Sequence, residues 1–318
     1  DILPARMDGY FAQDLEQLFS SGQFMWLRPG KAKSRAEDDT TPSNTGLLKN
    51  TPVMLLPRNT EQLWKSLPAV RASQVQLSST AQTLQQILRE QGASFFIDLV
   101  TASGLLRTQV ESALEELAAN GLVNADSFAG LRALITPQNR RPGFGNRYRR
   151  RSHAPGIEAA GRWSLITYED KFVEPDGWFT TGEEALEHIA RVLLMRYGVV
   201  FHQVLKRESL IPPWRDLLYV YRRLEARGEI RGGRFVAGFS GEQFALPEAA
   251  GLLQRTPRQQ ANFVCISACD PLNLVATILG GEKVPALQGI CLVFKNGVLV
   301  NICKQSVPTN SGTSETCW

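Results

Sequence analysis

The sequence predicts an α+β fold built from repeated modules, in each of which a helix ends at a glycine and leads directly into a strand. A sequence pattern of this kind occurs three times at intervals of about a hundred residues, from Leu15 to Phe24, from Leu114 to Val123 and from Tyr221 to Ile230. In every copy a glycine follows the helical apolar pair, and an apolar residue comes two positions after that glycine. An amphipathic helix that closes on a left-handed glycine explains the spacing. Three copies indicate modules, not one large domain.

The first copy predicts one helix over residues 11–20 and two strands, over residues 23–27 and 53–56. The connecting stretch 29–50 is polar and rich in Lys, Ser, Asp and Thr, which is typical of a long loop. The chain begins with Asp1 and not with Met, so we expect a fragment whose earlier helices lie upstream.

The second copy contains a complete motif, over residues 73–136. A capping box at Ser79 opens a helix that ends at Gly92, and residues 95–100 form a short second helix before the turn at Gly104. A second capping box, at Thr108, opens a third helix that ends at Gly121 and leads into a strand. This order is that of a helix-turn-helix with a wing. Residues 1–72 are then a partial winged-helix-like module with a long wing.

The third copy repeats the plan over residues 161–256 as a second complete winged helix. A cap from Thr180 to Glu183 opens its first helix, which ends at Gly198, and Pro212-Pro213 suits the start of its third helix. We expect the pair Gly232-Gly233 to form the tip of the wing hairpin, with residues 234–236 as the returning strand.

The remaining segments differ in composition. Residues 137–160 are a basic linker, rich in Pro, Gly, Asn and Arg, and residues 305–318 are a polar, flexible tail. Residues 257–304 predict a small β-rich module, with a strand over 262–267. Asn296-Gly297 joins strands 290–294 and 298–302 in a type I′ hairpin.

Composition and cysteine usage limit the class of protein. Hydrophobic residues make up 43% of the 318 residues, enough for sizeable cores, but no apolar run reaches the roughly 18 residues of a membrane span. We therefore expect no membrane partner. Five cysteines, an odd count without a leader, indicate a cytoplasmic protein with buried, inert thiols. The pair Cys265 and Cys269 lacks a second close pair or a nearby histidine, so we expect no metal site.

Basic residues are concentrated in one stretch of the linker. Phe144 and Tyr148 alternate there with six arginines, and no acidic residue interrupts them. Charge for phosphates and rings for bases suit a nucleic acid, although a solvated linker explains the same composition. The candidate DNA-binding residues of this stretch are Arg140, Arg141, Arg147, Tyr148, Arg149, Arg150 and Arg151.

The two complete winged helices supply a second set of candidate DNA-binding residues. A winged helix places its third helix against the major groove while basic side chains hold phosphates. The candidates lie at the start of the earlier third helix and on the later third helix and its wing: Arg107, Thr108, Gln109, Trp214, Arg215, Arg222, Arg223, Arg231 and Arg234. Salt bridges within the fold, or packing against protein, are the alternatives for these side chains.

Few residues suggest catalysis. The sequence contains no phosphate loop, so we expect this chain alone to hydrolyse no ATP and to hold no cofactor. Asp270 is the one catalytic candidate, and a turn-forming Asp before Pro271 is the alternative.

Several long stretches resemble the C-terminal region of the Lhr (large helicase-related) bacterial DNA helicases. The resemblance is in register from about residue 161 to 297 and looser, but in the same order, from residue 2 to 123. The stretches that carry it are residues 161–165, 196–201, 212–218, 221–236, 238–245, 269–274 and 284–287. From Asn301 to Trp318 the sequence departs from the family pattern.

The resemblance implies the C-terminal, DNA-binding and self-assembling part of an ATP-dependent 3′-to-5′ DNA repair helicase. It also implies that the β-rich module over residues 257–304 is barrel-like. The ATPase core, with its ATP and Mg²⁺, would lie upstream, and DNA, single-stranded or duplex, and further copies of the chain would be the partners. A nucleoid-associated, cytoplasmic location follows from the same resemblance. It also associates this region with uracil-DNA glycosylase activity of the AlkZ type, and a glycosylase needs a pocket and a carboxylate or polarised water. Three functions remain open: DNA-binding module, glycosylase domain and structural oligomerisation scaffold.

Overall fold

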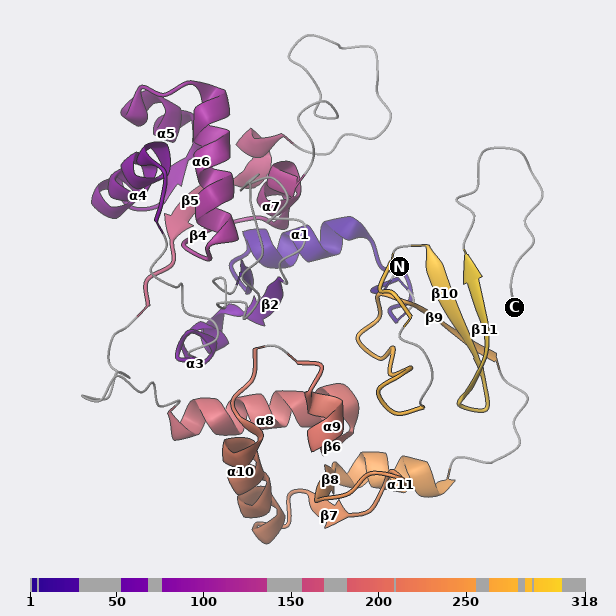
Figure 1. Cartoon of the computed structure of the whole chain (residues 1–318). Coiled ribbons are helices and arrows are strands. Elements are labelled where there is room, and N and C mark those ends of the chain that lie inside the picture. Colours follow the sequence, from indigo (N-terminus) through magenta and orange to yellow (C-terminus); the bar gives the residue numbers. More distant parts are fainter. Residues whose placement is uncertain are drawn as a thin grey trace, which may run out of the picture. The chain divides into compact units, whose positions relative to one another are not determined.

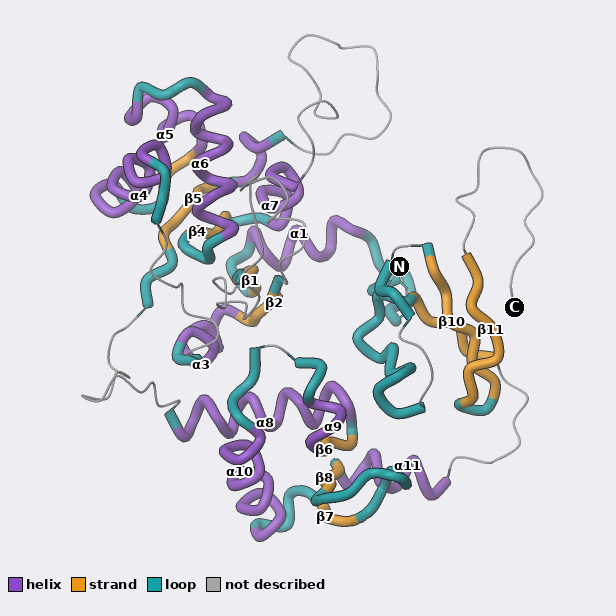
Figure 2. Tube along the Cα trace, in the orientation of Figure 1, coloured by secondary structure: helices purple, strands orange, loops and turns teal. Residues whose placement is uncertain are grey.

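The computed structural model describes ten stretches of the chain, which form two compact units (Figures 1 and 2). The described residues are 2–4, 6–28, 53–67, 76–135, 156–168, 182–208, 210–255, 263–279, 284–287 and 289–304. The N-terminal unit comprises residues 12–185 and 210–212, and the C-terminal unit comprises residues 1–11, 186–209 and 213–318. Among the described helices, none has the length and apolar character needed to cross a membrane.

The N-terminal unit begins with a helix and a hairpin. Helix α1 (Ala12–Ser20) leads into β1 (Phe24–Leu27), which pairs antiparallel with β2 (Met54–Pro57), and η1 (Arg58–Thr60) and α3 (Glu61–Lys65) follow. One helix and two strands are the last part of a winged helix, as the sequence predicts. The predicted wing between the strands lies outside the described residues.

A complete winged helix follows in the same unit. Its elements are α4 (Ser79–Gln91), β3 (Ser94–Phe95), α5 (Phe96–Ser103), α6 (Arg107–Ala119), β4 (Val123–Ala125) and β5 (Arg162–Leu165). Strand β5 lies between β3 and β4 and pairs antiparallel with both. Two further elements, α7 (Phe128–Ile135) and η3 (Ile157–Ala160), come between β4 and β5.

The position of β5 corrects the expected module boundary at residue 161. The strand completes the sheet of the second module, and its Trp163 is fully buried in the core of that unit. The basic stretch 137–160 therefore comes before the last strand of this module and does not separate two modules.

The C-terminal unit contains the third module, which has the same topology as the second. Its elements are α8 (Glu183–Tyr197), β6 (Val199–Phe201), α9 (His202–Leu205), α10 (Trp214–Ala226), β7 (Arg231–Gly233), β8 (Gln243–Ala245) and α11 (Pro247–Arg255). The strand order β6-β8-β7 repeats the order β3-β5-β4. Both modules are thus winged helices with the last strand in the middle of the sheet.

The wing of the third module differs from the predicted one. Gly232 and Gly233 lie within β7, opposite Phe244 and Gln243, so they are not a hairpin tip, and residues 234–236 form no strand. The Gly232 N–H donates to the Glu225 carboxylate at 3.0 Å, and a Cβ at Gly232 would collide with that carboxylate. A larger residue at position 232 would displace the Glu225 side chain and break this hydrogen bond. The wing extends over the nine residues 234–242.

The repeated sequence pattern has one structural cause. Gly22, Gly121 and Gly228 have φ values of 73°, 69° and 74°. The residue after each glycine donates its N–H to the leucine five positions earlier, at 3.1, 2.9 and 3.0 Å. This is the Schellman motif, which turns the end of a helix directly into a strand.

The last module is an antiparallel sheet of β9 (Phe263–Ser267), β10 (Ile290–Lys295) and β11 (Val298–Lys304), with β10 in the centre. Asn296 and Gly297 have φ values of 53° and 80°, so the type I′ hairpin is confirmed. In the described residues the sheet is open, with β9 and β11 at its edges, and the expected barrel is not seen.

Candidate nucleic-acid interface

The Schellman leucines Leu18, Leu117 and Leu224 align the third helices α1, α6 and α10 residue by residue. On α10, the side opposite the buried residues carries Arg215, Tyr219, Arg222 and Ala226. The aligned positions on α6 are Thr108, Ser112, Glu115 and Ala119. Those within α1 are Gln13, Glu16 and Ser20. The three helices differ in charge at the positions where a winged helix meets DNA.

The C-terminal half of the outer side of α6 is buried. Glu115 is 8% exposed, and Ala118 and Ala119 are buried as well, because α7 packs against this helix and contributes to the same core. Only the first turn of α6 and Ser112 reach the surface fully. Most of this third helix is unavailable for a DNA groove.

The predicted binding residues in the first turn of α6 have local partners. Arg107 forms an ion pair with Glu158 of η3, and its guanidinium lies 5.3 Å from the centre of the Phe96 ring. Gln109 accepts the N–H of Leu106, at 3.0 Å, and so caps the helix, which begins at Arg107 and not at the predicted Thr108 cap. Thr108 is exposed. These residues stabilise the helix start, and only part of their surface remains open.

Helix α1 contacts α7 through Glu16. One carboxylate oxygen of Glu16 accepts the N–H groups of Phe128 and Ala129, at 3.2 and 3.3 Å, and the other lies 3.6 Å from the Arg132 guanidinium. A carboxylate suits the exposed N–H groups at the start of α7. Glu16 is therefore used for packing within the N-terminal unit, while Gln13 and Ser20 on the same side of α1 are exposed and uncharged.

Helix α10 keeps its outer side open. Leu217, Val220, Tyr221 and Leu224 are buried on one side of it. On the opposite side the Arg215 side chain is 93% exposed and Tyr219 is 69% exposed. The ion-pair partner of Arg215 is the adjacent Asp216, at 3.4 Å, a weak arrangement at the surface.

The wing beside α10 is held in a fixed form by Gln243, which is 1% exposed. Its side-chain oxygen accepts the N–H groups of Phe235 and Val236, at 2.9 and 2.8 Å, and its nitrogen donates to the Val236 carbonyl at 2.9 Å. Arg231 and Arg234 are exposed at the base and start of this wing, and neither forms an ion pair with a described residue. No described carboxylate pairs with these two arginines, so both are available to bind a polyanion.

The other two predicted arginines of α10 are engaged by acids. Arg222 forms a two-pronged contact with Glu242, at 2.9 and 3.1 Å, and this hydrogen bond, together with the charge of Glu242, raises the pKa of Arg222. Arg223 donates to Glu187 of α8 at 2.8 Å and is less exposed than Arg222. For Arg223 the salt-bridge alternative fits the structure better than a phosphate contact.

Glu187 is the centre of an ion-pair network that the sequence analysis missed. Its carboxylate accepts from Arg191, Arg223 and Arg227, each at 2.8 Å, and Glu229 pairs with Arg191 and Arg227 in addition. The hydrogen bond from Arg191 is the main cause that lowers the pKa of Glu187. The four-residue spacing of Glu187 and Arg191 was a readable signal for this pair, but the contribution of α10 required the fold.

Trp214 has a packing role at the start of α10. Its ring centre lies 5.9 Å from that of His202 and 6.0 Å from that of Tyr221. Burial raises the pKa of the Tyr221 hydroxyl, which donates to the Ala190 carbonyl of α8. The tryptophan thus joins α9 and α10, and its partial exposure leaves one edge at the surface.

Residues 180–263, which include α10 and its wing, match the family model described as the winged-helix domain of the large helicase-related protein. The resemblance to the Lhr family is confirmed. The chain is 28% identical over 313 residues to the Lhr helicase/uracil glycosylase of Escherichia coli (strain K12), a match that covers 90% of this chain and 18% of that protein. It is 25% identical over 300 residues to the Lhr helicase/probable uracil glycosylase of Mycolicibacterium smegmatis (strain ATCC 700084 / mc(2)155), covering 88% and 18%. The chain therefore spans less than a fifth of the length of either Lhr relative.

Asp270, the catalytic candidate, is 5% exposed and firmly held. It pairs with Arg6 at 2.6 Å, and the same carboxylate oxygen accepts the Leu272 N–H at 2.7 Å. An Asp that binds the N–H two residues ahead across Pro271 is a turn former. The turn-forming alternative accounts for the position of Asp270 without a catalytic role.

The described cysteines are part of no metal site. The expectation of buried thiols is wrong for the four described cysteines: Cys265 is exposed, and Cys269, Cys291 and Cys303 are half-buried. Within the described residues no group of three Cys, His, Asp or Glu side chains could hold a metal ion.

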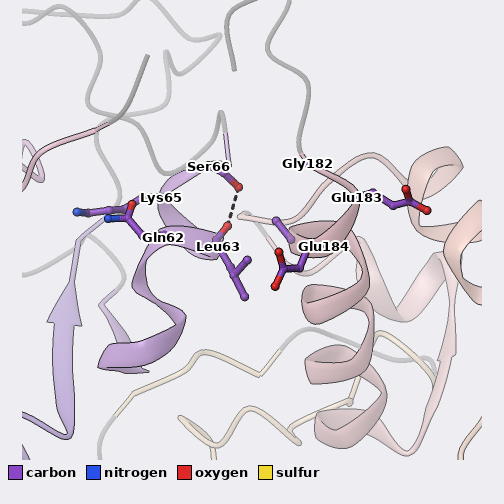
Figure 3. A pocket seen from close by; sticks show the side chains of 8 residues that line it. Gln62, Leu63, Lys65, Ser66, Gly182, Glu183 and Glu184 are labelled. Atoms are coloured by element: carbon purple, nitrogen blue, oxygen red, sulfur yellow. Dashed lines mark hydrogen bonds between the residues drawn. The ribbon is translucent and has the colours of Figure 1, made fainter. Parts of the chain in front are cut away.

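Figure 3 shows Glu183 and Glu184 in the first turn of α8, where acids suit the helix end but repel phosphates. The same view shows Ser66, whose hydroxyl donates to the Leu63 carbonyl at 2.7 Å and closes α3.

The six arginines and Tyr148 of the basic stretch, over residues 140–151, lie outside the described residues. Their role in binding DNA stays a prediction.

Proposed function

We propose that this chain is the DNA-binding region of an Lhr-type helicase, and that its third winged helix binds DNA through α10 and the adjoining wing. The outer side of α10 carries the proposal, because all four of its positions are exposed and two of them are basic. On the aligned sides of α6 and α1 no position is basic, Glu115 and Ala119 are buried, and Glu16 is bound by α7. Four arginines on or beside the outer side of α10 are exposed: Arg215, Arg231, Arg234 and the Glu242-paired Arg222.

The wing arginines suit contacts with phosphates. Neither has an ion-pair partner among the described residues, so binding a phosphate breaks no existing salt bridge. Gln243 fixes the wing beforehand, which lowers the ordering cost of binding. Each phosphate contact adds about 0.7–0.9 to the slope of log affinity against log salt.

The test is DNA binding by the whole chain, measured by fluorescence anisotropy over a range of salt concentrations. The double variant Arg231→Ala/Arg234→Ala is expected to bind roughly ten- to thirtyfold more weakly near physiological salt, and its salt slope should fall by about 1.5–2. Arg89→Ala on α4, an exposed arginine with a Gln86 partner, is the matched control and should bind as the wild type does. An unchanged slope in the double variant would exclude the wing.

The remaining parts of the activity belong to the longer protein in this proposal. The chain has no phosphate loop, so ATP, Mg²⁺ and 3′-to-5′ translocation would be supplied by sequence beyond it. We also expect self-association in the bacterial cytoplasm, and light scattering of the pure chain at several concentrations tests it: a monomer at all concentrations would argue against assembly through this region.

Uracil excision is the second candidate function, because the names of both relatives include uracil glycosylase. The assay is base release from DNA that contains a single uracil, with the wild type and Asp270→Asn. Release that is lost in Asp270→Asn, with the fold intact, would support catalysis by Asp270. Release that the substitution leaves unchanged would exclude Asp270, and no release by the pure chain would exclude the activity from this region.

A further inference from the structure

The open side of α10 carries an aromatic residue that no role within the fold explains. Tyr219 lies between Arg215 and Arg222 at spacings of four and three residues, so the three side chains share one side of the helix. It is 69% exposed, and neither its ring nor its hydroxyl has a partner among the described residues. A tyrosine that packed or capped this winged helix would be covered or hydrogen-bonded.

The state of Arg222 indicates what kind of ligand fits beside Tyr219. Glu242 occupies two guanidinium nitrogens, at 3.1 and 2.9 Å, and balances the charge. An arginine held in this way is a poor phosphate ligand, because two of its guanidinium N–H groups are already bonded and the ion pair is neutral overall. Its guanidinium is nevertheless fixed, and both faces of a fixed guanidinium plane can stack on a base. The Arg222 side chain remains 60% exposed, so the plane is accessible.

We infer that Tyr219 and Arg222 form a stacking platform for unpaired bases, which makes single-stranded DNA the preferred ligand of this side of α10. The inference rests on the proposed function, because it names the form of DNA that the third winged helix binds. A duplex presents only base edges in its grooves, whereas an unpaired strand presents the faces that a tyrosine ring contacts.

The surrounding charges agree with this assignment. Arg215 and Arg222 are seven residues apart, roughly 10 Å along the helix axis, which is the length of about three nucleotides of a stacked strand. Arg215 at one end of the platform has 93% of its side chain exposed, and Arg231 and Arg234 follow on the wing of the same module. These cations are placed to hold the backbone while the ring and the guanidinium plane hold bases.

The corresponding helices of the other modules lack such a platform. The positions aligned with Tyr219 and Arg222 are Ser112 and Glu115 on α6, and Gln13 and Glu16 on α1. None of these side chains is aromatic or basic. The inference therefore applies to α10 alone and predicts one stacking site in the three third helices.

The experiment compares Tyr219→Ala, Tyr219→Phe and wild type in binding to a fluorescent oligothymidine strand and to a duplex of the same length. Tyr219→Ala is expected to bind the strand about tenfold more weakly, because one stacked base is lost, and to bind the duplex within about twofold of the wild type. Tyr219→Phe keeps the ring and should bind like the wild type. Met195→Ala removes another exposed side chain of the same module, 77% exposed on α8, and should change neither affinity.

Strand binding by Tyr219→Ala at wild-type affinity would overturn the inference, and so would an equal loss for strand and duplex. A substitution that left DNA binding intact but changed the molecular mass in light scattering would assign Tyr219 to self-association instead. If the wild type bound neither DNA, the proposed function itself would fail, which separates the two outcomes. A 2-aminopurine base in the strand gives a second readout: its fluorescence should fall on binding to wild type and to Tyr219→Phe, but not to Tyr219→Ala.

Discussion

Helices α6 and α10 occupy the same place in two modules of the same strand order, yet the outer side of α6 is half buried and that of α10 is exposed along its whole length. Both end in the same Schellman motif, and both precede a three-stranded sheet with the last strand in the middle. The difference comes from α7, which is inserted between β4 and β5 and packs against α6. No described helix follows β7 before β8. The topology of a winged helix alone thus does not establish that its third helix can bind DNA.

The largest effect is expected when arginine replaces the alanine at two aligned positions, in Ala119→Arg on α6 and Ala226→Arg on α10. Ala119 is buried, so an arginine there places a charge in the core and is expected to destabilise the N-terminal unit by at least about 3 kcal/mol. Ala226 is exposed on the open side, and the same change should alter stability by less than about 0.5 kcal/mol. Urea unfolding of both variants measures the contrast.

The same pair of variants also tests DNA binding. Ala226→Arg adds a cation to the proposed binding side and should strengthen DNA binding severalfold at low salt. If Ala119→Arg were as well tolerated as Ala226→Arg, the enclosure of α6 in solution would be disproved.

Local sequence signals predicted the modules well because each depends on neighbours in the chain. Gly22, Gly121 and Gly228 end their helices through backbone geometry, and Asn296-Gly297 makes its turn in the same way. The wing was less predictable. The pair Gly232-Gly233 looks like a hairpin tip, but Glu225, in the last turn of α10, accepts the Gly232 N–H, and both glycines lie in a strand.

The binding residues were harder to predict, since their availability depends on distant partners. Arg222 and Arg223 are adjacent and equally basic in the sequence, but Glu242 and Glu187 engage them from different elements. Tyr219 was missed because the helical pattern marks aromatic residues as candidates for the core, and only the packing of α10 shows its exposure. Arg107 similarly depends on Glu158, on the far side of the 136–155 stretch.

A smaller effect is expected from Glu16, which attaches α1 to α7. Glu16→Ala removes the acceptor for the N–H groups of Phe128 and Ala129 and the partner of Arg132. The expected cost is about 1–2 kcal/mol, comparable with the loss of a helix N-cap. Arg222→Ala, the aligned change on α10, should cost less than Glu16→Ala because its ion pair is at the surface. Equal costs in urea unfolding would contradict the assignment of Glu16 as a packing residue.

The smallest effect concerns the inner side of α10, where Glu187 joins it to α8. Because the pKa of Glu187 is lowered in the folded state, chiefly by the hydrogen bond from Arg191, its carboxylate stabilises the fold at pH values above its unfolded pKa. This stabilisation is lost as the pH falls through the lowered pKa. Glu187→Gln should therefore reduce the free energy of unfolding by about 1 kcal/mol at neutral pH, and the difference from wild type should shrink as the pH falls through the lowered pKa. Glu184→Gln, on the exposed first turn of the same helix, is the control for loss of charge alone. A difference that did not change with pH would mean that the hydrogen-bonding geometry of Glu187, and not its charge, holds α10 against α8.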